Sequence, residues 1–300
     1  MSSKICGIVI FYNPTSQHIE SLKTNLDVLD GLIVVVNGEW DDRFHELSDR
    51  KNIEFIIEGS NLGIAKATND GILKAKLYNA YTHVCLLDQD TNLPKNYRDI
   101  LLLWDNLNPK NKVGIIAPTY KNPRTNIAAK ALIFNKYTFN RFQPSNHIER
   151  VSCPIASGSL LSLEIFDQVG LLREDLFIDY VDNEFSLRLL SKGYVNYMTS
   201  NICMLHELGE QKIFRLLGLE IRPTNHSPIR KYYISRNRME IIKCYGLKTP
   251  SIITFELIAI FYDLFRVIAF ETKKLEKIQL SFLGFLDFTR RRFGKINDWR

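Results

Sequence analysis

Two carboxylates with one residue between them directly follow an apolar run, in Asp88-Gln89-Asp90. On an extended chain, side chains at positions i and i+2 point to the same side, so two negative charges would lie together at a strand end. Mg²⁺ and Mn²⁺ prefer oxygen ligands and commonly share them with substrate phosphates. A D-x-D pair can also be an ordinary turn, but here it is a candidate site for a metal-bound diphosphate.

A second group of acids begins a later helical pattern, in Asp179-Tyr180-Val181-Asp182-Asn183-Glu184. Acids at a helix start can be caps or partners of the helix dipole, which would account for one of them. Three acids within six residues also suggest a general base. Further along, His206 follows the apolar run Ile202–Leu205, where a third metal or phosphate contact could be supplied.

Aromatic and amide side chains after the first apolar run could bind a nucleotide. Phe11-Tyr12-Asn13-Pro14 offers a ring for stacking and an amide for hydrogen bonding to a nucleobase. Asn61-Leu62-Gly63 precedes a helical pattern that carries Asn69-Asp70-Gly71. The alternative interpretation is that these glycines only mark turns.

Short apolar runs alternate with helical patterns through the first half of the chain. Strands are expected at Ile5–Tyr12, Gly31–Val36, Ile53–Ile57, Thr82–Leu87, Val113–Pro118 and Tyr194–Tyr197, and helices at Gln17–Leu29, Ala65–Tyr78 and Asn183–Lys192. This alternation predicts an α/β fold with a mostly parallel sheet between helices. Ligands of such sheets bind at the carboxyl ends of the strands, where the motifs above fall. The polar segment Lys121–His147 is expected to be a loop region or a small hairpin.

Composition agrees with a globular protein of the reducing cytosol. The 300 residues are 45% hydrophobic, enough for one large domain or a domain with an appendage. The first apolar run is too short for a signal peptide. The five cysteines include no CxxC pair, which argues against a zinc site or a disulfide framework.

The C-terminal quarter differs from the rest in charge and pattern. Residues 229–300 carry 15 Lys and Arg against 7 Asp and Glu, whereas the remainder carries 24 against 26. This asymmetry suggests an anionic partner surface. Glu256, Asp263 and Arg266 interrupt the one long apolar run and disfavour a spanning helix. We expect a domain at 1–228 and a helical extension at 229–300 that lies on a membrane face, or else packs on the sheet or in a homo-oligomer.

The order of these motifs resembles family 2 glycosyltransferases of the GT-A fold, in particular their rhamnosyltransferase branch. The resemblance covers essentially the whole chain. The segments that show it are FYNP at 11–14, NLGIAKATNDG at 61–71, LLDQD at 86–90, SGSLLS at 157–162, LFIDYVDNEFSLR at 176–188, HELG at 206–209 and RKYYISRN at 230–237. It implies a Rossmann-like mixed sheet flanked by helices, with a C-terminal helical extension.

The resemblance also implies roles for single residues. It makes Asp182 the catalytic base, Asp90 and His206 ligands of Mg²⁺ or Mn²⁺, and a further set the donor-binding residues. That donor-binding set is Tyr12, Asn13, Asn37, Asn61, Gly63, Asp88 and Arg236. Val181 stands where many relatives have an acid, so Asp179 and Glu184 remain alternative bases. The chain also reads Val35-Val36-Asn37-Gly38 where relatives often have Val-Asp-Asn.

The implied activity is transfer of one sugar with inversion at the anomeric carbon, in the synthesis of a bacterial cell-surface polysaccharide. The resemblance suggests dTDP-L-rhamnose as donor, with a UDP-hexose as the alternative. It suggests a saccharide acceptor, lipid-linked at the inner face of the cell membrane, which would suit the basic C-terminal helices.

Three other classes of protein are alternatives. A nucleotidyltransferase would need a Gly-rich, basic phosphate loop after the first strand, which the sequence lacks. Intact Asp88, Asp90 and Asp182 argue against a non-catalytic glycan-binding protein. The C-terminal basic residues alternate with long aliphatic stretches, which favours a bilayer surface over nucleic acid.

Overall fold

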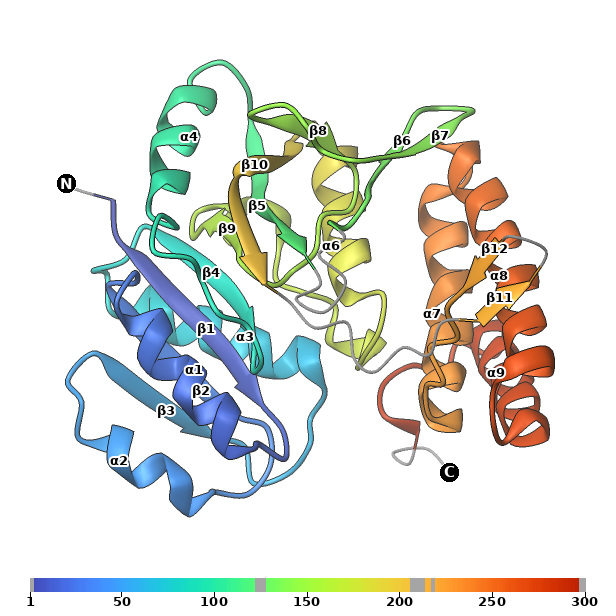
Figure 1. The fold of residues 1–300 in the computed structure, drawn as a ribbon, viewed down its shortest axis with the longest axis horizontal. Coiled ribbons are helices and arrows are strands. Elements are labelled where there is room, and N and C mark those ends of the chain that lie inside the picture. Colours follow the sequence, from blue (N-terminus) through green and yellow to red (C-terminus); the bar gives the residue numbers. More distant parts are fainter. Residues whose placement is uncertain (1–2, 122–127, 206–213, 217–218, 297–300) are drawn as a thin grey trace. The chain divides into compact units, whose positions relative to one another are not determined.

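The computed structural model describes residues 3–121, 128–205, 214–216 and 219–296, and these form two compact units (Figure 1). The first, the sheet unit, comprises Met1–Ile133, Arg141–Glu174 and Val181–Glu207. The second, the helical unit, comprises Phe134–Asn140, Asp175–Tyr180 and Leu208–Arg300. The sequence placed the boundary at residue 228. That boundary stays a prediction; in the structure, the two short segments Phe134–Asn140 and Asp175–Tyr180 group with the C-terminal helices.

One mixed sheet forms the centre of the sheet unit, in the strand order β3-β2-β1-β4-β9-β5-β10-β8. β1 pairs in parallel with β2 and β4, and β5 pairs in parallel with β10, while β9 is antiparallel to both β4 and β5. The parallel strands therefore share one carboxyl edge. The strands are β1 (Ile5–Phe11), β2 (Gly31–Val36), β3 (Ile53–Ile57), β4 (His83–Asp88), β5 (Val113–Lys121), β8 (Glu149–Val151), β9 (Ser159–Ser162) and β10 (Val195–Leu205).

Helices connect and cover these strands. They are α1 (Ser16–Leu26), α2 (His45–Ser48), α3 (Ile64–Leu77), α4 (Asp99–Leu107), α5 (Ile165–Val169) and α6 (Val181–Ser191), with 3₁₀ turns η1 (Asp42–Phe44) and η2 (Glu174–Leu176). Thr15 caps α1, because its hydroxyl accepts a hydrogen bond from the His18 N–H. Gly63 begins α3 at φ 91° and ψ 159°, a backbone region that is essentially restricted to glycine.

The expected mostly parallel α/β sheet is confirmed, with differences in detail. The strand expected at Tyr194–Tyr197 and the apolar run Ile202–Leu205 belong to one strand, β10, which has a register irregularity between Thr199 and Cys203. Within the polar segment, β6 (Ala131–Phe134) and β7 (Phe139–Phe142) pair as a small sheet, so the hairpin interpretation was right. α4 and β8 were not expected, because short elements give too few residues for a clear period.

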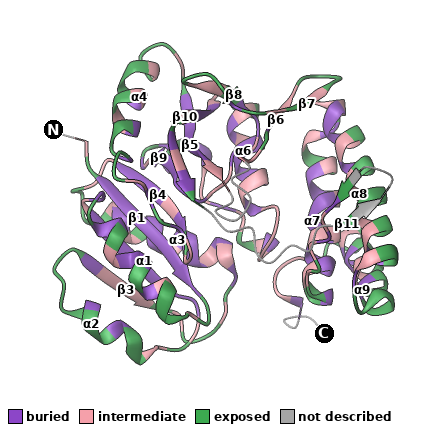
Figure 2. Ribbon diagram, in the orientation of Figure 1, coloured by how far each residue is buried: buried purple, intermediate pink, exposed green. Residues whose placement is uncertain are grey.

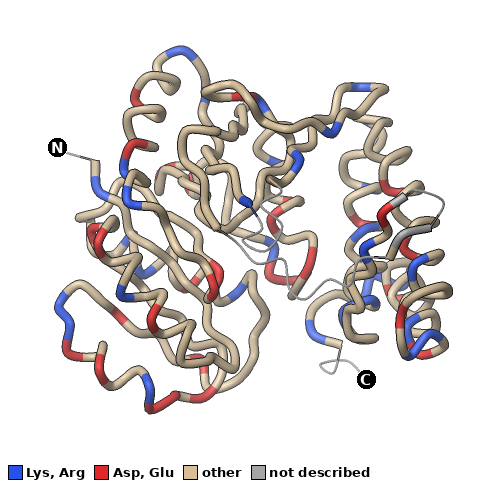
Figure 3. Tube along the Cα trace, in the orientation of Figure 1, with Lys and Arg blue, Asp and Glu red and all other residues tan. Residues whose placement is uncertain are grey.

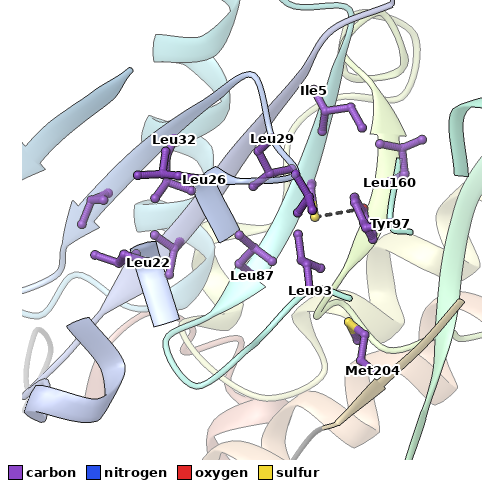
Figure 4. Packing of buried hydrophobic residues seen from close by; sticks show 14 of the residues in the cluster. Ile5, Leu22, Leu26, Leu29, Leu32, Leu87, Leu93, Tyr97, Leu160 and Met204 are labelled. Atoms are coloured by element: carbon purple, nitrogen blue, oxygen red, sulfur yellow. Dashed lines mark hydrogen bonds between the residues drawn. The ribbon is translucent and has the colours of Figure 1, made fainter. Parts of the chain in front are cut away.

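The core of the sheet unit surrounds β1, whose seven residues are all buried. Figure 4 shows apolar side chains from α1, β2, β4 and β9 packed in one cluster. The Tyr97 hydroxyl lies within this cluster, where it donates to the Gly158 carbonyl at 2.9 Å and hydrogen-bonds with the Cys85 thiol at 3.0 Å. Burial raises the pKa of the Cys85 thiol to about 12, so Cys85 is a protonated core residue and not a nucleophile.

The helical unit consists of α7 (Pro228–Tyr245), α8 (Pro250–Phe270) and α9 (Lys274–Thr289), with the small strands β11 (Phe214–Leu216) and β12 (Leu219–Ile221). Ser227 caps α7, and Pro228 occupies its first turn. α9 approaches α7 closely at Gly284, where a Cβ would lie 2.3 Å from the Tyr232 carbonyl oxygen. Only glycine fits at this crossing.

Buried ion pairs connect the three long helices. Arg238 of α7 contacts Glu256 and Asp263 of α8, at 3.0 and 2.7 Å. Lys277 of α9 pairs with Glu271 at 2.9 Å, and both side chains are almost fully buried. The acids that interrupt the apolar run of α8 are therefore internal partners. Within the described residues, no helix is both long and apolar enough to cross a membrane.

The first prediction concerns acid sensitivity through His83, which is buried in β4 with its ring 4.8 Å from that of Trp104. Burial lowers the pKa of His83 from 6.5 to about 4. Between pH 6.5 and about 4, His83 is therefore protonated in the unfolded chain and neutral in the folded one. Stability should be intact above pH 6.5 and fall by up to about 1.4 kcal/mol per pH unit as pH drops towards 4.

Replacing His83 with Phe keeps a ring against Trp104 and removes the titration. Unfolding midpoints of wild type and His83→Phe should therefore run parallel above pH 6.5 and diverge below it, with the wild type falling faster. Parallel curves down to pH 4.5 would contradict the assignment.

Candidate active site

Asp88, Gln89, Asp90 and Thr91 form a tight turn at the carboxyl end of β4. The Thr91 N–H donates to the Asp88 carbonyl at 3.0 Å, the bond that closes a β-turn. The expectation of an extended chain through Asp88 and Asp90 was therefore wrong, because β4 ends at Asp88 and the chain reverses. The turn leaves the Asp88 side chain exposed and that of Asp90 half-buried, both at the shared carboxyl edge.

Gln89, between the two acids, connects this turn to the end of β1. Its Oε1 accepts a hydrogen bond from the Tyr12 N–H at 3.1 Å. Tyr12 itself is 50% exposed, so its ring is accessible beside the turn. Asn13 follows, exposed and at φ 50°. Tyr12 and Asn13 therefore lie at the same edge as the acids, as the sequence predicted.

Asn37, Asn61 and Gly63 form one hydrogen-bonded group after β2 and before α3. Asn37 is 4% exposed, and its amide bonds to the Leu62 N–H at 2.8 Å and to Asn61 Oδ1 at 3.3 Å. Asn61 Oδ1 also accepts from the Gly63 N–H at 2.9 Å. Asn37 is thus occupied in shaping the Asn61-Leu62-Gly63 turn, which explains why an amide suits that position.

A chain of neighbours leads along the carboxyl edge from the acidic turn to Asp182. Asn92, two residues after Asp90, bridges to Leu205 at the end of β10. Met204 pairs with Tyr120 at the end of β5. Burial raises the pKa of the Tyr120 hydroxyl, Arg141 partly offsets that rise, and the Asp182 carboxylate adds to it, so Asp182 lies within electrostatic range of Tyr120. The structure therefore brings Asp182 to the edge that carries Asp88 and Asp90.

The two other acids of the second cluster are bound to arginines. Glu184 is 3% exposed and pairs with Arg188, one helical turn later, at 2.9 Å. Asp179 accepts three contacts of 3.0–3.1 Å from Arg230, although burial raises its pKa. Asp182 is half-buried at the first turn of α6. Of the three acids, Glu184 is therefore the one that is buried, and Asp179 and Asp182 are both half-buried.

Arg236, expected to contact the donor, lies in a different environment. Its side chain is fully buried in the helical unit. The guanidinium donates to the carbonyls of Gly294, Asp175 and Leu176 at 2.7–3.2 Å, and to Asn237 at 3.0 Å. These bonds occupy its donors, so the structure gives Arg236 a structural role in place of the expected donor contact. The sequence could not predict that Arg236 is buried, because α7 has no distinct apolar face from which its buried side could be recognised.

His206, the expected second metal ligand, lies outside the described residues. Leu205, the last described residue before it, is placed beside the acidic turn by its bridge to Asn92. Within the described ranges, no cluster of three or more His, Cys, Asp or Glu side chains forms a metal site by itself.

The chain is 29% identical over 296 residues to the dTDP-rhamnosyl transferase RfbF of Shigella flexneri, covering 97% of each chain. The chain is a glycosyltransferase of the GT-A fold. No family model matches this glycosyltransferase. Its fold is similar to S. aureus TarS 1–349, with a TM-score of 0.58 and 13% identity over 96% of this chain and 82% of that one. It is also similar to the mannosyltransferase PcManGT of Pyrobaculum calidifontis, solved with GDP-Man and Mn²⁺, with a TM-score of 0.55 and 15% identity over 96% and 75%.

The sequence motifs did not single out Gln89 or Tyr120. Gln89 lies between two acids, but its hydrogen bond to Tyr12 joins residues 77 positions apart and forms only because β1 and β4 pair. Tyr120 comes two residues after the strand expected at Val113–Pro118, and that position was the available signal; in the structure it lies near the end of β5.

Proposed function

We propose that this glycosyltransferase transfers a sugar from a nucleoside diphosphate donor to an acceptor hydroxyl with inversion, and that L-rhamnose is the sugar. The observation that supports this most is the position of Asp88, Asp90 and Asp182 along the same carboxyl edge of the sheet. Strand-end acids can serve a diphosphate, and a separate acid can accept a proton. The arrangement therefore suits a single displacement between donor and acceptor.

The donor is proposed from the relative of similar length. RfbF is named a dTDP-rhamnosyl transferase, and this chain aligns with nearly all of it. dTDP-L-rhamnose is therefore the first donor to test. A UDP-hexose is the alternative, since a solved complex of TarS with UDP-GlcNAc has the same fold, with a TM-score of 0.55.

The residues at the acidic turn fit a divalent ion shared with a diphosphate. Mg²⁺ and Mn²⁺ are usually bound through one or two carboxylates plus substrate phosphates, so a complete protein cage is not required. Asp90 would be a ligand, Asp88 would support it or contact the donor, and His206 would complete the set. When bound, the ion would neutralise charge that develops on the leaving diphosphate.

Asp182 is proposed as the general base. The acceptor oxygen forms a bond to the anomeric carbon while the bond from that carbon to the diphosphate oxygen breaks. The bonding electrons leave with the nucleoside diphosphate, and the hydroxyl proton passes to Asp182. No side chain becomes attached to the sugar, so one displacement inverts the anomeric configuration.

The second prediction tests donor and metal together. Thermal unfolding against a panel of nucleotide sugars, with and without Mn²⁺, should show the largest rise in midpoint for dTDP-L-rhamnose with Mn²⁺, because ligands that bind only the folded state stabilise it. Asp90→Ala should remove the metal-dependent part of the rise and abolish turnover while the chain stays folded.

Excess EDTA should inhibit the wild-type enzyme, and added Mg²⁺ or Mn²⁺ should restore it. Full activity in excess chelator would refute the metal role. A larger shift with a UDP-hexose would instead replace the donor and leave the reaction class intact.

The third prediction concerns the base. Asp182→Asn keeps the size of the side chain but removes its ability to accept a proton, so turnover should fall by roughly 10²-fold or more with donor affinity little changed. Glu184→Gln is the matched comparison, because it alters a buried, arginine-paired acid of the same helix and should act through stability. An active Asp182→Asn enzyme beside inactive Glu184→Gln or Asp179→Asn would show that another carboxylate is the base.

The helical unit is proposed to contact an anionic membrane, where a lipid-linked saccharide acceptor would be found. Large apolar residues at helical spacing are exposed along α8, and others are exposed on α9. Figure 2 marks exposed residues on both helices. Those of α8 include Leu257, Phe261, Phe265 and Ile268, and Phe261 is 70% exposed. Exposed apolar faces of this kind are a feature of interaction sites.

Charge in the helical unit favours an anionic partner over a neutral one. Several bases of this unit are buried with acids, including Lys231, Arg238 and Lys277, so many of its acids do not reach the surface. Figure 3 shows where Lys and Arg lie along the helices of this unit. The exposed ones include Lys243, Lys248, Lys273, Lys274 and Arg290. Each base near an anionic leaflet contributes about 1 kcal/mol to attachment.

The fourth prediction follows from this surface. Wild type should co-sediment with vesicles containing phosphatidylglycerol more than with neutral vesicles, and 0.5 M salt should weaken binding. Phe261→Ser and the pair Lys273→Gln with Lys274→Gln should each reduce it. Leu77→Ser is the matched control, because Leu77 is equally exposed but lies on α3 of the sheet unit. If vesicles do not bind and Phe261→Ser instead changes the particle size in light scattering, the face is a homo-oligomer interface.

A further inference from the structure

A set of almost fully buried polar side chains surrounds the backbone of the acidic turn. Thr91 and Ser157 are each 1% exposed, and their hydroxyls hydrogen-bond to one another. Both accept from the backbone N–H of Asp88, Thr91 at 3.1 Å and Ser157 at 3.5 Å. The residue that begins the turn is therefore fixed by two hydroxyls from separate parts of the chain.

Asn25 of α1 fixes the other end of the turn. Its Nδ2 donates to the Thr91 carbonyl at 2.9 Å, and its Oδ1 accepts from the Leu93 N–H at 2.9 Å. Asn25 is also 1% exposed. One amide thus satisfies a backbone acceptor and a backbone donor on either side of Asn92, a pairing that no apolar side chain could replace.

Ser157 is itself positioned by its neighbour Gly158. The Gly158 N–H donates to the Leu86 carbonyl at 2.7 Å, two residues before Asp88, and its carbonyl accepts from the Tyr97 hydroxyl. Gly158 has φ 75°, and a Cβ there would lie 2.5 Å from Met204 Sδ. Glycine is therefore required to bring Ser157 to the turn.

We propose that Thr91, Ser157 and Asn25 are positioning residues that set the Asp88–Asp90 turn in the orientation that binds the metal-diphosphate group of the donor. The inference rests on the proposed function. Two like-charged carboxylates in a turn repel each other, and a turn on a loosely held loop would separate them. Hydrogen bonds to the backbone on both sides resist that separation without placing another charge near the acids.

The test is titration calorimetry of a nucleoside diphosphate with and without Mn²⁺. In wild type, Mn²⁺ should tighten binding. Thr91→Val keeps the shape of the side chain and removes its hydroxyl. The factor by which Mn²⁺ raises nucleotide affinity, the Mn²⁺-dependent gain, should therefore be about tenfold smaller, while the affinity without metal is unchanged. Ser157→Ala should shrink the gain about threefold, because its contact with Asp88 is longer. Thr91→Ser restores a hydroxyl and should restore the gain.

Thr199→Val is the matched control for lost stability. Thr199 is fully buried in the same unit, and its hydroxyl donates to the His147 carbonyl at 2.7 Å, away from the acidic turn. It should lower the unfolding midpoint and leave the Mn²⁺-dependent gain intact.

Two results would overturn the inference: an unchanged gain in Thr91→Val and Ser157→Ala, or an equal loss in Thr199→Val and Thr91→Val. A wild-type protein with no Mn²⁺-dependent gain would overturn the proposed metal role itself, and the inference with it. If nucleotide binding and sugar transfer persist while the Mn²⁺-dependent gain in affinity is unchanged in the variants, the proposed function stands and only the positioning roles are removed.

Discussion

Parallel pairing of β1 with β2 and β4 is the constraint on which the rest of the site depends. Because these strands run in one direction, the residues after them emerge at one edge, where Tyr12, Asn37 and Asp88 are found. Antiparallel β9 enters between β4 and β5 and brings Ser157 to that same edge. The hydrogen bonds of the ladder thus determine which distant residues can act together.

Polar groups at this edge fall into exposed residues and buried residues that support the backbone. Tyr12 and Asp88 are exposed, whereas Asn37, Asn25 and Thr91 are buried and use their side chains to satisfy backbone groups of the turns. A buried amide or hydroxyl without a partner would destabilise the fold, so such residues are retained only where the backbone needs them. The backbone bonds of Asn37, Asn25 and Thr91 thus explain why these polar side chains are buried while Tyr12 and Asp88 are exposed to solvent.

In the helical unit, too, buried polar side chains hydrogen-bond to backbone groups, and one of them, Arg236, is charged. Arg236 and Asn237 bond to carbonyls of the 175–180 segment, including those of Leu176 and Asp179. That segment contains Phe177, Asp179 and Tyr180, three non-glycine residues at positive φ, a costly conformation that persists only under external support. Two distant side chains on α7 thus stabilise the backbone that leads into α6 and Asp182.

The sequence by itself determined the βαβ order and the two acidic motifs, one at a strand end and one at a helix start, because period and turn chemistry are local properties. It also indicated the glycosyltransferase class through the order of those motifs. The sequence could not show that Gln89 bonds to Tyr12, that Asp179 pairs with Arg230, or that Arg236 is buried. Those facts depend on which groups meet across long separations and on how much water remains around them, and only the packed tertiary structure decides both.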